Sequence, residues 1–376
     1  MEPENGYTHN FHPYAAKFPP FAVRSLIEKY TNISDWVLDP FCGSGTTLVE
    51  CRLLCRNATG IELNPVGKLI SETKAALYSK EDLNLVLKAV SRLEGHCLTL
   101  NEWIKSVSSE DVLPNHPNKE FWFKPHILKE LYAIKLIIDE YADHVKAYNL
   151  LMTGFLRIIV PVSNQESETR YKAIDKNLPL GYALRLYLKV ISSYVETLKK
   201  YDLANTLCDA KIDVIEGDAR EQINHLSHKF DFVITSPPYI NSYDYYLYHK
   251  HRIYWLNKDP KIVRKLEMGG HHTIDSQTFE KAITSYRDTM VSVFQGLNKT
   301  LKTGKYFAIL IGDGIVKGER VKANELVTEV AKLSGFEQIS TMSIPLKEVS
   351  RRFIKGTNGY EKLHHVIVLR KLNELN

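Results

Sequence analysis

The hydrophobic and polar positions of the chain alternate between short apolar runs and longer segments of helical periodicity. Apolar spacing typical of helices occurs at 48–54, 125–141, 184–201 and 324–334. Seven short apolar runs predict strands, at 36–38, 58–65, 212–215, 230–234, 305–312, 337–343 and 364–370. Strands that alternate with helices in this way favour an α/β fold, with one seven-stranded sheet covered by helices on both faces.

The strand pattern is interrupted once, between about residues 71 and 205, where only helical periodicity is found. Residues 164–170 are polar and are predicted to form a loop. We therefore predict three segments: an N-terminal half of the main domain (1–70), a mainly helical insertion (71–208) and the second half of the main domain (209–376).

Composition and charge narrow the class of protein. The chain has 376 residues and a net charge of +5, which is compatible with a polyanionic partner but too small to require one. Its five cysteines are odd in number and lack CxxC spacing, so neither a disulfide framework nor a zinc site is expected. The N-terminus is polar, and no apolar run approaches the roughly 18 residues of a membrane span. We expect a cytoplasmic protein without a membrane segment.

Two strand ends carry the candidate chemistry. The first predicted strand runs into a glycine-rich turn, Asp39-Pro40-Phe41-Cys42-Gly43-Ser44-Gly45-Thr46-Thr47, and the second ends near Glu62. A strand, a glycine-rich turn, a helix and an acid after the next strand form a unit that seats nucleotide-like ligands. The fourth strand ends in Thr235-Ser236-Pro237-Pro238-Tyr239. There a hydroxyl, carbonyls and a ring face stand at a strand's carboxyl end, which suits a planar ring bearing an amino group.

Together these motifs resemble the S-adenosylmethionine-dependent amino-methyltransferases of DNA, which share a Rossmann-like methyltransferase sheet. Serine before Pro237-Pro238-Tyr239 resembles the N4-cytosine type, because the N6-adenine enzymes usually carry Asp or Asn there. Residues 12–20 (HPYAAKFPP) resemble the segment that closes over the methionine part of the cofactor. The order of the two halves and the position of the insertion depart from many family members, so a target-recognition role for 71–208 is a hypothesis.

The resemblance implies roles for individual residues. Asp39 would lie near the amino-acid end of S-adenosylmethionine, Glu62 would accept hydrogen bonds from the ribose hydroxyls, and Asp218 would meet the adenine amino group. An N-cap or a plain loop acid is the alternative for Asp218. The full predicted cofactor set is Lys17, Phe18, Pro19, Asp39, Phe41, Gly43, Ser44, Gly45, Thr46, Thr47, Glu62, Asn64, Asp218 and Ala219. The predicted catalytic residues are Ser236, Pro237, Pro238 and Tyr239.

An aromatic and basic stretch follows the catalytic motif and could line a path for a flipped base and its phosphates. The alternative is a helix that buries its tyrosines and leaves its charges in solvent. The predicted DNA contacts are Tyr243, Tyr245, Arg252, Arg351 and Arg352. The pairs His271-His272 and His364-His365 lack a Cys or carboxylate at ligand spacing, so no metal is expected.

The predicted reaction is methyl transfer from S-adenosylmethionine to N4 of a cytosine flipped out of double-stranded DNA, in a restriction-modification system whose partner would be a cognate endonuclease. N6-adenine methylation is the first alternative. An RNA or small-molecule N-methyltransferase is the second, and a non-catalytic nucleic-acid binder is the third. Intact glycines and an intact Ser-Pro-Pro-Tyr motif argue against the last.

Overall fold

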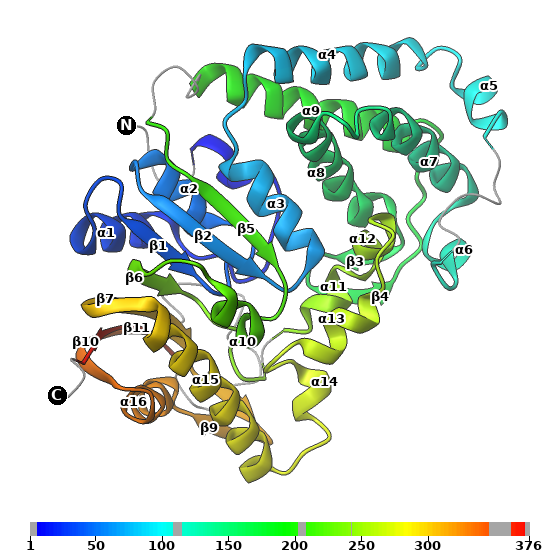
Figure 1. Cartoon of the computed structure of the whole chain (residues 1–376). Helices are drawn as coiled ribbons and strands as arrows, with labels where there is room; N and C mark the ends of the chain where they lie inside the picture. The colour runs from blue at the N-terminus through cyan, green and yellow to red at the C-terminus, as the bar shows by residue number, and fades with distance from the viewer. Residues whose placement is uncertain (1–5, 108–114, 202–207, 242, 346–361, 373–376) are drawn as a thin grey trace. The chain divides into compact units, whose positions relative to one another are not determined.

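The structure is a computed structural model that describes residues 6–107, 115–201, 208–241, 243–345 and 362–372 (Figure 1). The chain forms two compact units, each assembled from separate parts of the sequence. The sheet unit comprises Phe18–Asn64, Asp209–Tyr245 and Ile262–Asn376. The helical unit comprises Met1–Lys17, Pro65–Cys208 and Tyr246–Lys261. The predicted boundaries at 70 and 208 placed residues 1–17 and 246–261 in the main domain. In the structure these residues belong to the helical unit instead.

The sheet unit is built on one sheet of seven strands, in the order β10-β11-β7-β6-β1-β2-β5. Strands β5, β2, β1, β6 and β7 run parallel to one another. Strand β11 pairs antiparallel with β7, and β10 pairs antiparallel with β11. The seven strands predicted from the apolar runs are all present. Their bounds are β1 Trp36–Asp39, β2 Asn57–Glu62, β5 Ile212–Glu216, β6 Phe230–Thr235, β7 Leu301–Gly312, β10 Phe336–Pro345 and β11 Leu363–Lys371.

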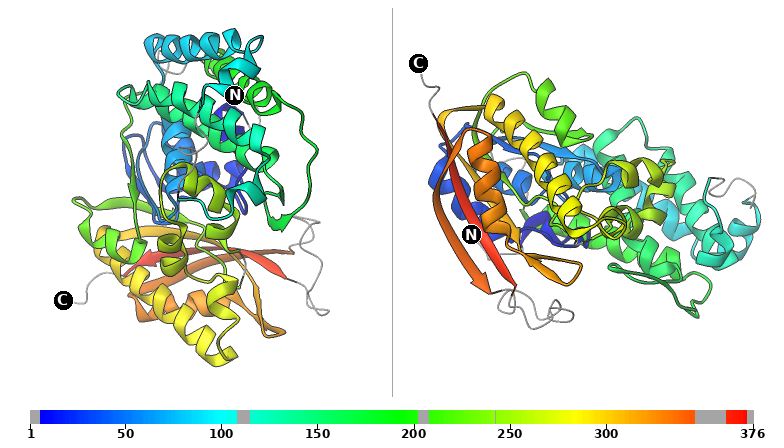
Figure 2. Two further views of the ribbon diagram at one scale, coloured as in Figure 1. Left: turned by 90° about the vertical axis from the view of Figure 1, so that its right-hand side faces the viewer. Right: turned by 90° about the horizontal axis from the view of Figure 1, so that it is seen from below.

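Helices cover both faces of this sheet, as predicted (Figures 1 and 2). Helix α2 packs on β2 and α1 on β6, while α15 and α16 pack on β7. The buried core between α15, α16 and the sheet is aromatic, with Phe294, Phe307 and Phe336 in edge-on contact. The helices of the sheet unit are α1 Pro20–Tyr30, α2 Thr46–Leu53, α10 Ala219–Gln222, η3 Ile223–His225, α14 His271–Ile274, α15 Phe279–Thr300 and α16 Ala323–Leu333.

Two short hairpins were not predicted. Strands β3 (Gln165–Ser167) and β4 (Arg170–Ala173) pair within 164–170 and beyond, so the loop predicted there is wrong. These strands are too short and too polar to show an alternating pattern. In the sheet unit, β8 (Gly314–Val316) and β9 (Glu319–Val321) are joined by Lys317 and Gly318, which both have positive φ. Two such residues form the turn that suits a two-residue hairpin.

The helical unit packs around α8, whose buried face includes Gly154. A Cβ there would lie 2.2 Å from Ile191 Cδ1, so only glycine allows α9 to approach so closely. The fully buried Glu130 of α7 accepts hydrogen bonds from the backbone of Gly181, Ala183 and Leu184, which caps α9. The helices are η1 Tyr7–Asn10, α3 Pro65–Ala75, α4 Lys80–Gly95, α5 Leu100–Lys105, α6 Lys119–Trp122, α7 Pro125–Asp139, α8 Val145–Val162, α9 Tyr182–Tyr201 and α12 Lys250–Trp255. The boundaries between the units along the chain fall within helices α11 (Tyr245–Tyr248) and α13 (Pro260–Leu266).

Two sequence expectations are corrected here. Helix α8 is, by length and composition, apolar enough to cross a membrane, so the statement that no run approaches this length is wrong. Two thirds of that helix is buried inside the protein, which is the behaviour of a core helix. Cys55 and Cys208 are disulfide-bonded, where no disulfide was expected, while Cys42, Cys51 and Cys97 are free.

Candidate functional site

The candidate site lies at the carboxyl ends of the central strands of the sheet. Strand β1 pairs in parallel with β2 on one side and with β6 on the other, so the chain changes direction across the sheet at β1. Open α/β sheets bind their ligands at such a switch point. Both predicted motifs, after β1 and after β6, are thereby brought to the same edge.

The glycine-rich turn after β1 depends on two left-handed residues. Gly43 has φ 53° and Gly45 has φ 77°, and Gly45 is the N-cap of α2. Side chains with a Cβ adopt this conformation at a cost of roughly 1 kcal/mol. Ser44, Thr46 and Thr47 are buried in the same turn. The turn therefore presents backbone N–H groups and the start of a helix to the edge of the sheet, an arrangement that suits a polar ligand.

Asp39 joins this turn to the catalytic motif. One carboxylate oxygen accepts a hydrogen bond from Thr235 Oγ1 at 2.7 Å, and the other accepts one from Thr47 Oγ1 at 2.6 Å. The backbone of Phe41 donates a third, at 3.1 Å. Burial raises the pKa of Asp39 to about 6, and these three hydrogen bonds oppose the shift. The side chain thus fixes the end of β6 against the start of α2.

Glu62 faces the same turn from the end of β2. Its carboxylate oxygens accept hydrogen bonds from the backbone N–H of Gly43 and of Asn64, both at 2.8 Å. Burial raises the pKa of Glu62 to about 7, which the two hydrogen bonds oppose. Each oxygen has two lone pairs and uses one of them here, so the carboxylate keeps acceptor sites for the hydroxyls of a ligand.

Asp218 follows β5, where the structure gives it a local role. Its side chain accepts from the backbone of Arg220, which makes it the N-cap of α10, and it forms an ion pair with the guanidinium of Arg220. This is the N-cap alternative raised by the sequence, and Ala219 is the buried first residue of that helix. An adenine contact by Asp218 would share the carboxylate with Arg220.

The predicted closing segment is divided between the units. Lys17 belongs to the helical unit, where its ammonium donates to the carbonyl of His9 at 2.9 Å, and burial lowers its pKa. Phe18 is buried in the sheet unit, and Pro19 is the N-cap of α1. These positions leave their predicted cofactor role as a proposal.

The predicted catalytic motif, Ser236 to Tyr239, follows the fully buried strand β6. Burial raises the pKa of Tyr239 to about 12, and a hydrogen bond with the Ser236 side chain partly lowers it. In this hydrogen bond either hydroxyl can donate, and in both cases the serine oxygen keeps a lone pair that can accept from another group. The ring of Tyr239 packs against the end of β7, where a Cβ on Gly312 would lie 2.7 Å from Cε2.

The segment after the motif is tied to residues 267–272. The backbone N–H of Asn241 donates to Gly269 at 2.7 Å, and that of Tyr245 donates to Glu267 at 2.7 Å. His272 contacts Asp244 at 2.7 Å. The rings of Tyr243 and Tyr245, both predicted to contact DNA, lie 5.7 Å apart between centroids.

Asp244, Glu267 and His272 could together hold a metal ion, because their ligand atoms lie within 4.8 Å of one another. The fold supplies carboxylates that the sequence spacing around His271-His272 did not show. However, His272 Nδ1 faces Asp244 at 2.7 Å and Nε2 faces the Arg264 carbonyl at 2.8 Å. Both ring nitrogens of His272 therefore already have hydrogen-bond partners. A metal ion would have to replace the proton between His272 and Asp244.

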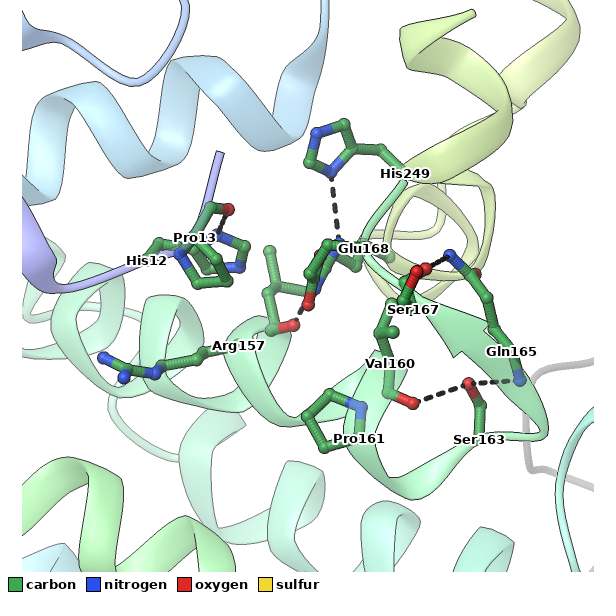
Figure 3. A network of polar contacts seen from close by, with 12 residues as sticks. His12, Pro13, Arg157, Val160, Pro161, Ser163, Gln165, Ser167, Glu168 and His249 are labelled. Atoms are coloured by element: carbon green, nitrogen blue, oxygen red, sulfur yellow. Dashed lines mark hydrogen bonds and ion pairs between the residues drawn. The ribbon is translucent and has the colours of Figure 1, made fainter. Parts of the chain in front are cut away.

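Arg252 is not available for DNA contact, which corrects its predicted role. It is fully buried in the helical unit, where Nη2 lies 2.7 Å from Glu168 and Nε donates to the carbonyl of Leu156 at 2.8 Å. Figure 3 shows a network of polar contacts in the helical unit that includes Glu168 and His249. The partner of Arg252, Glu168, is 84 residues away in sequence, which is why the basic stretch looked exposed. Arg351 and Arg352 lie outside the described residues.

Two contributors to the site were missed by the sequence analysis. Thr235 was quoted in the motif without a role, and its partner Asp39 is 196 residues away. Tyr286 of α15 donates its hydroxyl to the carbonyl of Pro238 at 2.7 Å. Tyr286 occupies an apolar-face position of an amphipathic helix, so its sequence signal is that of a core residue.

Comparison with known proteins can now be set beside this geometry. Residues 1–72 match the N6_N4_Mtase family model, described as DNA methylase. The type II methyltransferase M.MjaII of Methanocaldococcus jannaschii is 22% identical over 79% of this chain and 71% of its own length. M.BsoBI of Geobacillus stearothermophilus is 26% identical over 75% of this chain, which spans 59% of that relative. Among solved structures, a SAM-dependent methyltransferase from Methanosarcina mazei aligns with 93% of this chain and 98% of its own, at 11% identity and a TM-score of 0.34.

The relatives and the matching family support a DNA methyltransferase that depends on S-adenosylmethionine. The family name joins N6 and N4 methylation, so it does not separate adenine from cytosine.

Proposed function

We propose that this chain is a site-specific DNA methyltransferase that transfers a methyl group from S-adenosylmethionine to the exocyclic N4 of cytosine. The observation that carries the base assignment is Ser236, in the position directly after β6 where the resembling adenine enzymes usually carry Asp or Asn. Its side chain is hydrogen-bonded to Tyr239, and whichever hydroxyl donates, the serine oxygen keeps a lone pair for an incoming amino group.

The proposed cofactor contacts follow the geometry at the switch point. The lone pairs of Glu62 that are not used by Gly43 and Asn64 would accept from the ribose hydroxyls. The turn from Phe41 to Thr47 would lie against the methionine part, with Lys17, Phe18 and Pro19 closing over it. Asp218 and Ala219 would border the adenine. S-adenosylmethionine supplies an activated methyl group on its sulfonium, so the protein needs to supply orientation rather than a strong base.

The reaction needs two acceptors and one stacking surface. Ser236 and the Pro237 carbonyl would accept hydrogen bonds from the target amino group, which moves the nitrogen toward sp3 geometry and frees its lone pair. That lone pair would form the new N–CH3 bond while the S–CH3 bond of the cofactor breaks and its electron pair returns to sulfur, so that S-adenosylhomocysteine leaves and the amino group releases one proton to solvent. Tyr239 would stack on the base.

The proposed substrate is duplex DNA with the target base flipped out. The amino group is paired inside the helix, and an enclosed site reaches it only after extrusion. We propose residues 71–208 as the target-reading segment, and Tyr243 and Tyr245 as contacts to the flipped nucleotide. A cognate restriction endonuclease would be the partner, in the cytoplasm.

N6-adenine methylation is the second candidate, because the family name includes it and both amino groups fit a similar pair of acceptors. An RNA N-methyltransferase would use the same cofactor site on another nucleic acid.

Nucleoside mass spectrometry tests the proposal. DNA from a methylation-free host that expresses the chain is compared with DNA from the same host that expresses Ser236→Ala. We expect N4-methylcytosine with the wild type alone. N6-methyladenine would overturn the base assignment, and the absence of both marks, with cofactor still bound, would move the substrate to RNA.

A further inference from the structure

The predicted catalytic motif contains two consecutive proline carbonyls, those of Pro237 and Pro238. The second of them is held by a side chain from another part of the sheet unit. The carbonyl of Pro238 accepts a hydrogen bond from the Tyr286 hydroxyl at 2.7 Å. Tyr286 lies in the middle of the 22-residue helix α15 and is 3% exposed. Burial raises the pKa of this hydroxyl, so it stays protonated and acts as a donor. The contact therefore joins the motif to one of the long helices on the sheet.

Gly269 packs against the same point of the motif. It has φ 71°, and a Cβ there would lie 3.0 Å from the Tyr239 carbonyl oxygen and 3.2 Å from Tyr286 Cε2. Its own carbonyl accepts from the backbone of Asn241 at 2.7 Å. Asn241 Nδ2 in turn donates to the Ile315 carbonyl at 2.6 Å. Tyr286, Gly269 and Ile315 thus contact the motif and the residues just after it from three separate parts of the chain.

We propose that Tyr286 is a positioning residue for methyl transfer, a proposal that rests on the function proposed above. By holding the Pro238 carbonyl, its hydroxyl fixes the rotation of the Pro237–Pro238–Tyr239 backbone. That rotation decides where the preceding carbonyl, of Pro237, points. The two acceptors of the target amino group, Ser236 and Pro237, are then set before the base arrives.

The stiffness of the prolines makes a single anchor effective. Each proline ring fixes φ, so the rotation that is left in this dipeptide is mainly about ψ. A hydrogen bond to the Pro238 carbonyl restrains the ψ of Pro238 directly, and through the fixed φ of Pro238 it limits how the preceding peptide plane, which carries the Pro237 carbonyl, can turn. Orientation is where enzymes gain much of their rate, and displacements near 1 Å can cost about 100-fold.

The test is Tyr286→Phe, which removes one oxygen and keeps the ring. We expect kcat for DNA methylation to fall about 10- to 100-fold, or about 1.4 to 2.7 kcal/mol. The KM for DNA and the dissociation constant for S-adenosylmethionine should stay within about twofold, because this hydroxyl acts on the acceptor geometry of the transition state.

The matched control is Thr300→Val, in the same helix. Thr300 is also buried, and its hydroxyl donates to backbone carbonyls, those of Gly296 at 3.3 Å and Leu297 at 3.2 Å, but it lies at the far end of α15 from the motif. This variant should lose similar thermal stability and keep its kcat. Gly269→Ala gives a second, independent disturbance, because its new methyl group meets the Tyr239 carbonyl while the Tyr286 hydroxyl is intact. It should lower kcat as Tyr286→Phe does.

The outcomes separate cleanly. A kcat for Tyr286→Phe within twofold of the wild type, in a folded variant, would overturn the inference. So would equal losses of kcat in Tyr286→Phe and Thr300→Val, because these would show a general stability effect. Absence of methylation by the wild-type protein itself would instead refute the proposed function.

Discussion

The substitution Glu62→Gln gives the sharpest test of the proposed cofactor site. It keeps the shape of the side chain, removes its charge and replaces one acceptor oxygen with an N–H2 donor. Its two carboxylate oxygens each hold a backbone N–H at 2.8 Å, from Gly43 and Asn64. An amide cannot accept both, because one of its ends is a donor. The variant therefore loses the charge and turns an N–H2 group toward one of the two backbone donors.

The magnitude follows from the pKa of Glu62, which burial raises from 4.5 to about 7. At 1.36 kcal/mol per pH unit, ionising this buried group costs the folded protein about 3 kcal/mol. Because the folded pKa lies above the unfolded one, this cost is absent below pH 4.5, grows between pH 4.5 and 7, and is complete above pH 7. Hydrogen bonds to a charged acceptor contribute about 1.5 to 3 kcal/mol, so cofactor hydroxyls that donate to Glu62 can offset the cost of ionising it.

Stability and cofactor binding should respond differently at pH 8. Glu62→Gln removes an ionisation cost of about 3 kcal/mol and loses one backbone hydrogen bond of about 1.5 to 3 kcal/mol, so the free protein should melt close to the wild type. Its dissociation constant for S-adenosylmethionine, measured by titration calorimetry, should rise about 10- to 100-fold. At pH 5.5 most of the wild-type carboxyl is protonated, and the ratio of the two dissociation constants should shrink. A ratio that is the same at both pH values would refute the reasoning.

Three further predictions use the same structure. Ser236→Ala and Tyr239→Ala should each reduce methylation to background in a radiolabel-transfer assay while calorimetric binding of S-adenosylmethionine survives; full activity in both would end the catalytic assignment. Arg252→Met should lower the free energy of unfolding by about 1–3 kcal/mol in a urea titration, because it removes the buried donor to the Leu156 carbonyl and the partner of the partly exposed Glu168 carboxylate; an unchanged free energy of unfolding would contradict this. The helical unit should lose stability as the pH falls below about 6.5, because burial lowers the pKa of several of its histidines and the unfolded chain then binds more protons than the folded one. A melting temperature that does not change between pH 7.5 and 5.5 would contradict that role for His12, His116, His249 and His251.

The strands and the glycine-rich turn could be predicted because their signals are local. Each strand is a short apolar run, and Gly43 and Gly45 are needed where the backbone is left-handed. The hydrogen bond between Asp39 and Thr235 could not be predicted, since no local pattern links residues 196 positions apart. The role of Tyr286 could not be predicted for a different reason. A tyrosine on the apolar face of a helix has the same sequence pattern whether or not its hydroxyl contacts the candidate site. Arg252 was misassigned for a similar reason: its basic neighbours are local, and its partner Glu168 is not.

The centre of the sheet also sets the order in which the chain can fold during synthesis. Strand β1 pairs with β6, and Asp39 and Thr235 are 196 residues apart. At about 5–20 residues per second, a ribosome needs roughly 10–40 s to make that interval. The helical unit does not escape this delay, because it includes Tyr246–Lys261. The helical unit therefore cannot be completed before residue 261 leaves the exit tunnel, and the edge of β1 that faces β6 stays unpaired until Phe230–Thr235 has emerged.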